Sequence, residues 1–153
     1  MSNSFDVGTL TTLGEAMQKW RALELEGDMT DKIPVEITQA FEQHDAVHIL
    51  FNCGTSVEDE IAVHIWMLFA TTAKISEMHR AVANLEHRQV LSGIGHLKLV
   101  STWVSCLPRI VSIIFKSLQM KKRLALEELS ILKEQPIIKI RREHGMILEK
   151  KSC

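Results

Sequence analysis

The stretch TLGEAMQKWRALELEG, residues 12–27, carries the start, the repeat and the stop of a helix. Thr12 and Glu15 have the spacing of a capping box, in which the hydroxyl and the carboxylate satisfy backbone N–H groups of the first turn. The glycine that closes the stretch tolerates the left-handed conformation found after a last turn. One apolar face follows at helical spacing, formed by Leu13, Met17 and Trp20. We therefore expect a helix that begins at Thr12.

A second helix is expected to begin at Thr30 or Asp31, because either side chain can cap it. Its apolar face contains Ile33, Ile37 and Phe41. The short connection between the two helices predicts antiparallel neighbours. Two helices do not enclose a core, so both apolar faces need cover from the rest of the chain or from another molecule. We interpret residues 9–52 as a helical hairpin that serves as a docking domain.

Residues 55–92 are expected to form β-structure. From Ile61 to Phe69 the residues alternate with a period of two and include β-branched side chains, which favours a strand. A buried helix fits such a short apolar run nearly as well. Residues 73–79 and 85–91 fit further strands, and Glu77 to Asn84 fits a helical turn or two as an alternative.

The charge divides the chain near residue 92. Residues 1–92 hold six Lys/Arg and 14 Asp/Glu, a balance of −8, whereas residues 93–153 hold 12 and five, a balance of +7. We interpret residues 93–153 as a basic C-terminal extension, with a helix over 118–134 that Pro136 ends. Its apolar run from Leu99 to Phe115 is shorter than the roughly 20 residues of a membrane span. Arg109 inside this run would cost roughly 2.5–3.5 kcal/mol on insertion, which favours a buried or partner-facing segment.

The basic residues of this extension could neutralise nucleic-acid phosphates. No aromatic residues are interleaved with them and no reading module is recognisable, so a solvated tail, or one folded back on the acidic half, explains them equally well. The candidate nucleic-acid contacts are Lys121, Lys122, Arg123, Arg141 and Arg142.

Catalytic and metal motifs are weak. His44 and His48 have the i, i+4 spacing of a zinc-protease helix, but Asp45 stands where that chemistry uses Glu. A third ligand would come from His64 or from the acidic run 58–60, and we interpret the pair as two surface histidines. Cys53 beside either His48 or His64 is more simply a small residue than a nucleophile. We therefore predict no enzyme, no metal and no cofactor. The three cysteines fit a reducing compartment, and nothing reads as a signal peptide.

The N-terminal part resembles the small (gamma) subunit of transcription factor IIA. Thr11-Thr12-Leu13-Gly14 is similar to the family's opening motif, residues 27–33 are similar to its inter-helix turn, and Trp66 to the tryptophan of its Val-Trp-Thr strand. The resemblance covers about residues 9–92. The segment between Phe41 and Trp66 is shorter than in the family, and residues 93–153 match nothing in it.

This resemblance implies an α+β fold, in which the helical hairpin is half of an intersubunit four-helix bundle and a small β-barrel part follows it. The extension is then mostly helical or disordered. The implied partners are the large subunit of transcription factor IIA, the TATA-binding protein and, indirectly, promoter DNA, in RNA polymerase II initiation in the nucleus, without a membrane. The implied bundle interface is Leu13, Met17, Trp20, Ile33, Ile37 and Phe41, and the implied barrel core is Ile65, Trp66 and Leu68. The alternative is a helical adaptor or membrane-peripheral binding protein with a basic tail.

Overall fold

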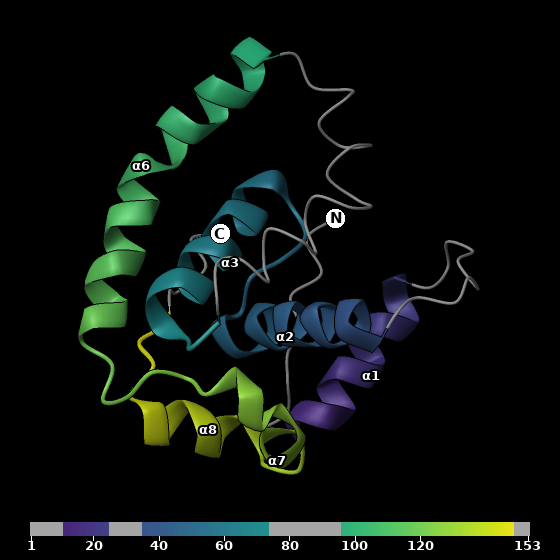
Figure 1. Cartoon of the computed structure of the whole chain (residues 1–153). Coiled ribbons are helices and arrows are strands. Elements are labelled where there is room, and N and C mark those ends of the chain that lie inside the picture. Colours follow the sequence, from purple (N-terminus) through teal and green to yellow (C-terminus); the bar gives the residue numbers. More distant parts are fainter. Residues whose placement is uncertain (1–10, 25–34, 74–95, 149–153) are drawn as a thin grey trace.

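The computed structural model describes residues 11–24, 35–73 and 96–148, and these residues form helices without any strand. Figure 1 shows α2 and α3 near the centre, α1 against α2, the long α6 along one side, and α7 and α8 together beneath. The elements are α1 (Leu13–Glu24), α2 (Val35–Phe51), α3 (Val57–Ala70), α6 (His96–Leu118), the 3-10 turn η1 (Leu126–Glu128), α7 (Leu129–Lys133) and α8 (Ile137–His144).

The helix expected from Thr12 is present as α1, and its capping box is formed. The backbone N–H of Thr12 donates to Glu15 Oε2 at 3.0 Å, and the backbone N–H of Glu15 donates to Thr12 Oγ1 at 3.2 Å. These two bonds satisfy donors that a helix start leaves without intrahelical partners. The expected stop of α1 and start of the second helix, residues 25–34, lie outside the described residues.

The predicted β-barrel part is wrong for the residues that the structure describes, because the apolar run from Ile61 to Phe69 lies inside α3. Ser56 caps this helix by accepting a hydrogen bond from the Asp59 backbone N–H. The acidic run 58–60 then occupies the first turn, where the helix dipole favours negative charge. Since α3 is apolar around most of its circumference, its pattern does not separate a period of two from 3.6. The predicted barrel-core residues Ile65, Trp66 and Leu68 are therefore helical, and the strands expected at 73–79 and 85–91 lie almost wholly outside the described residues.

Two isolated β-bridges join the C-terminal part to the N-terminal part in place of a sheet. Thr12 pairs with Pro136, and Thr71 pairs with Leu124. Around them, Leu13 donates its N–H to Gln135, and the Leu124 N–H donates to Ala70. The hydrophobic core is correspondingly shared: it includes Leu13, Met17, Trp20, Leu50, Trp66, Leu124, Leu129, Ile137 and Ile140. The division at residue 93 does not separate two cores.

The helix expected over residues 118–134 is only partly present. The helix α6 ends at Leu118, a non-helical stretch follows, and η1 with α7 covers residues 126–133. Pro136 then stands as the N-cap of α8, where its missing N–H costs no helical hydrogen bond. Among the described residues, no helix combines the length and apolar character that crossing a membrane requires.

The basic extension folds back on the acidic half. Arg141 donates from Nε to the carbonyl oxygen of Leu50 at 2.9 Å and from Nη2 to the carbonyl oxygen of Ile49 at 2.8 Å. Both carbonyl groups lie at the C-terminal end of α2. Arg123 likewise donates to the Leu68 carbonyl oxygen near the end of α3. Carbonyl groups at helix C-termini lack intrahelical donors, and a cation there also complements the helix dipole. Arg141 and Arg123, both predicted as nucleic-acid contacts, are thus engaged within the chain. Arg123 is nevertheless exposed, as are Lys121, Lys122 and Arg142.

We expect Arg141→Ala to lower the free energy of unfolding by about 2 kcal/mol, because hydrogen bonds from charged donors contribute on this scale. The matched control is Arg142→Ala, which removes an exposed neighbour of the same charge and should change stability by less than about 0.5 kcal/mol. Urea denaturation of both variants measures the difference. Equal losses would show that Arg141 acts through net charge rather than through the α2 carbonyl groups.

Candidate functional site

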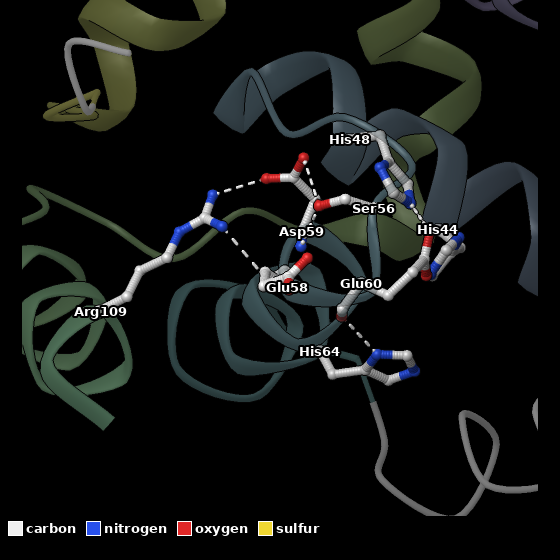
Figure 2. A network of polar contacts seen from close by, with 8 residues as sticks. All are labelled: His44, His48, Ser56, Glu58, Asp59, Glu60, His64 and Arg109. Carbon is white, nitrogen blue, oxygen red and sulfur yellow. Dashed lines mark hydrogen bonds and ion pairs between the residues drawn. The ribbon is translucent and has the colours of Figure 1, made fainter. Parts of the chain in front are cut away.

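A cluster of ionisable side chains lies where α2 faces the first turn of α3. Glu60 places one carboxylate oxygen 3.3 Å from Nε2 of His44 and the other 3.2 Å from Nε2 of His48. In the part of the chain that the structure describes, these three residues are the one group of metal-ligating side chains whose donor atoms all lie within 4.8 Å. Figure 2 shows them together, with His64 below Glu60 and Arg109 approaching the same turn from α6.

Local sequence features create this juxtaposition. The i, i+4 spacing puts both histidines on one face of α2. The helix ends at Phe51, and Asn52 then adopts a left-handed conformation with φ of 56°, which reverses the chain. The Cys53 N–H donates back to the His48 carbonyl oxygen, closing the helix end. Ser56 starts α3 only a few residues later, so the acidic first turn faces the last turns of α2.

Aromatic and polar neighbours fix the cluster. Trp20 of α1 stacks on His48 with ring centroids 5.2 Å apart, and His44 contacts the rings of both His48 and His64. Nδ1 of His64 lies 2.7 Å from the carbonyl oxygen of Glu60 and donates to it, since a carbonyl only accepts. Asp45 is bound instead by Arg21, whose Nε lies 3.0 Å from the Asp45 carboxylate.

The cluster is an ion-paired unit with shifted pKa values. Burial disfavours the charged forms of both Glu60 and His48, but the contacts between them outweigh it. The hydrogen bonds and charges of His44 and His48 hold the pKa of Glu60 far below its usual range. The hydrogen bond and charge of Glu60, with the charge of Asp45 and a backbone contact to Cys53, raise the pKa of His48.

The interpretation of His44 and His48 as two surface histidines is wrong for His48, whose side chain is only 2% exposed. The acidic run was one of the two sources considered for a third ligand, and the structure supplies Glu60 from it. Asp45, the residue in the place of a general base, faces Arg21 and not the space between the histidines. Sequence spacing identified the histidine pair, but the packing of α3 against α2 selected the carboxylate.

A second surface with functional character is the outer apolar face of α6. Its side chains are between 44% and 72% exposed. This face consists of Val100, Trp103, Val104, Leu107, Val111, Phe115 and Leu118. On the opposite side of the helix, Cys106 and Ile113 are buried, and α6 packs against α3. The 99–115 run was predicted to be buried or partner-facing. In the structure it lies in a helix with one buried face and one exposed face.

The residues predicted for a partner-subunit interface are mostly turned inward. Leu13, Met17 and Trp20 are buried in the chain's own core, and Phe41 is half-buried on α2. Ile33 lies outside the described residues, and the side chain of Ile37 is not described. Trp66, from the predicted barrel core, is buried and stacks on Phe51 with ring centroids 4.2 Å apart.

Comparison with known proteins gives no match: no family model, no curated protein and no solved structure is significantly similar to the chain.

We expect Glu60→Gln to destabilise the fold by about 1–2 kcal/mol, and most strongly between about pH 4.5 and 6.5. The lowered pKa of Glu60 stabilises the fold above its unfolded value of 4.5, and this gain is lost as the pH falls toward the folded value. The raised pKa of His48 stabilises the fold below its unfolded value of 6.5, and this gain is lost as the pH rises through the folded value. Urea denaturation at a series of pH values measures the difference between wild type and variant.

The matched control is Glu58→Gln, an exposed carboxylate in the same first turn of α3. It should lower the free energy of unfolding only by the small contribution of one carboxylate at a helix N-terminus. A flat difference for Glu60→Gln over the same pH range would contradict the ion-paired cluster.

Proposed function

We propose that the chain is a non-enzymatic helical adaptor, which binds an amphipathic helix of a partner protein along the outer apolar face of α6. The observation that carries the proposal is the exposure of seven large apolar side chains on one helix. Together they leave on the order of 600 Å² of apolar surface in water, at the upper end of what monomeric proteins show. At about 25 cal/mol per Å², covering this surface releases roughly 15 kcal/mol before the cost of association.

The shape of this face fits a helix. From Val100, the exposed positions 104, 107, 111, 115 and 118 cover 18 residues in five steps, or 3.6 residues per step. That is the α-helical period, so these side chains form one ridge along α6, about 27 Å long at 1.5 Å per residue. Pro108 lies inside this helix, and a proline there bends the axis. A partner helix of similar length can lay its own apolar stripe along such a ridge.

The flanks of the face favour a protein partner over a membrane surface. Helices that lie in a membrane interface carry Lys and Arg along the polar side of the apolar stripe. Here one flank carries the small hydroxyl residues Ser101, Ser105 and Ser112. The other flank carries the half-buried Ile110 and Ile114, and Lys116 is also half-buried. Arg109 is held by Asp59 at 2.7 Å and by the Glu58 carbonyl oxygen, which directs it toward α3.

The charge of this region defines the partner further. Residues 87–126 contain no Asp or Glu, and the exposed Lys121 and Lys122 follow the C-terminal end of α6. A partner helix with acidic residues at the end that meets these lysines is therefore complementary. A second copy of α6 is not complementary, because it would bring basic residues to a basic surface.

We expect a synthetic helical peptide with a leucine stripe and glutamate flanks to bind the purified chain. Val104→Asp and Leu107→Asp should each weaken binding at least tenfold, since each buries an unpaired charge. The matched control is Ser130→Asp, which adds the same charge at an exposed position of α7, outside the apolar face of α6 and its flanks, and should change binding less than twofold. Fluorescence anisotropy of the labelled peptide measures the affinity.

Further measurements distinguish an acidic partner helix from other molecules that could cover this face. The same peptide with lysine flanks should bind more weakly. Binding of the wild type to phosphatidylserine vesicles in place of the peptide would instead identify a membrane surface. Concentration-dependent dimerisation that Val104→Asp abolishes would identify a second copy.

A second candidate function is that of the small subunit of transcription factor IIA, which pairs with the large subunit and supports the TATA-binding protein on promoter DNA in the nucleus. Its support is the helical pair, with the capping box formed at the motif that carries the resemblance. Pairing through Leu13, Met17 and Trp20 requires these side chains to leave the chain's own core. The outer face of α6 needs no such rearrangement.

Co-expression with the large subunit, followed by affinity purification, tests this second candidate. If pairing uses the predicted bundle interface, Ile37→Asp and Phe41→Asp should abolish co-purification while Val104→Asp leaves it intact. The reverse pattern would assign the large subunit to α6. Absence of any association would exclude this candidate while leaving the peptide experiment to decide the first.

A further inference from the structure

We propose that His44, His48 and Glu60 form a binding site for a divalent transition-metal ion, with Zn²⁺ the best-fitting ion. This site lies between α2 and α3 and is separate from the outer apolar face of α6 on which the proposed adaptor function rests.

The spacing of the donor atoms fits a tetrahedral ion. Zinc binds imidazole nitrogen and carboxylate oxygen at about 2.0–2.2 Å, so neighbouring ligand atoms of a tetrahedron lie roughly 3.3 Å apart. The two nitrogen-to-oxygen distances to Glu60 are 3.3 Å from His44 and 3.2 Å from His48. All three donor atoms lie within 4.8 Å of one another. Small side-chain movements suffice to centre an ion among them.

The chemical nature of the donors selects the ion class. Two imidazoles with one carboxylate suit zinc and its transition-metal neighbours, whereas magnesium and calcium prefer all-oxygen sites. Three protein ligands leave one tetrahedral position for water or another small ligand, as in open zinc sites. The side chains of His44 and Glu60 are 23% and 31% exposed, so an ion reaches the site from their side. His48 closes the other side at 2% exposure.

The surroundings hold the three ligands in place. The ring of His48 stacks on Trp20, and the ring of His44 lies between those of His48 and His64. The hydrogen bond from His64 to the Glu60 carbonyl oxygen anchors the backbone that carries the carboxylate (Figure 2). Such neighbours restrict the rings and the helix turn before any ion arrives, which lowers the entropy cost of binding.

The same three donor atoms serve the ion pair and a bound ion. Each imidazole nitrogen that faces Glu60 gives up any proton it carries when it binds a cation. A divalent cation bound to two neutral imidazoles and one carboxylate takes the place of those protons, so the affinity should rise with pH.

Isothermal titration of the full chain with Zn²⁺ in a non-thiol reducing buffer tests the proposal. The Cys153→Ser background removes the terminal thiol, and Cys53 and Cys106 are buried. We expect one ion per chain. His44→Gln and Glu60→Gln should each lower the affinity at least tenfold, and Glu58→Gln, the matched control on the same turn of α3, less than twofold. Zn²⁺ should also raise the melting temperature of the wild type but not of Glu60→Gln.

Cobalt spectroscopy identifies the ligands independently. Co²⁺ in the site should give the visible absorption of a tetrahedral complex, without a sulfur-to-cobalt charge-transfer band. His44→Gln should abolish this visible absorption. Binding without one-to-one stoichiometry, affinity unchanged in both variants, or a sulfur-to-cobalt band would each overturn the proposal. If circular dichroism shows that Glu60→Gln does not fold, the His44→Gln variant alone tests the site. His44 is the better histidine to replace, because its side chain is less buried than that of His48. None of these results alters peptide binding at α6.

Discussion

Residues 124–140 lie over the apolar faces of the N-terminal helices, and the two parts share one hydrophobic core. A pair of helices has no interior of its own, and the large apolar residues of α1 and α2 are stable only when another layer excludes water from them. Leu13, Leu50 and Ile140 are all fully buried within this shared core. The bridge between Thr12 and Pro136 and the bonds from Arg141 to the α2 carbonyl groups bring that layer into place. The basic half therefore meets the acidic half through hydrogen bonds to backbone groups at helix ends.

The sequence predicted those parts of the fold that local chemistry decides. The capping box at Thr12 requires only residues within one turn, and it is formed as expected. The strand predicted from Ile61 to Phe69 is a helix, because apolar residues around most of the circumference of α3 remove the difference between the two periodicities. The better signal was the cap: Ser56 is followed three residues later by Asp59, a helix-start pattern that lay just before the apolar run.

The candidate site divides in the same way. The i, i+4 spacing of His44 and His48 is a local property and was visible, whereas the position of Glu60 depends on the turn after α2 and on the packing of α3. The interpretation of the apolar faces left open whether the cover came from this chain or from another molecule. In the structure, the chain itself covers the apolar face of α1 and leaves the outer apolar face of α6 exposed. That outcome depends on contacts between residues more than 90 positions apart, such as Ile49 with Arg141, which no sequence window contains.

The first turn of α3 contacts both α2, which carries the two histidines, and α6, which carries the exposed apolar face. Asp59 binds Arg109 of α6, and the next residue, Glu60, binds the histidines of α2. Consecutive residues on a helix point about 100° apart, so a single turn holds one neighbour on each side. Asp59 therefore holds this turn against α6, and Glu60 holds it against α2. The histidine cluster and the outer face of α6 are separate in chemistry, and the position of α3 is set by a charged contact on each side.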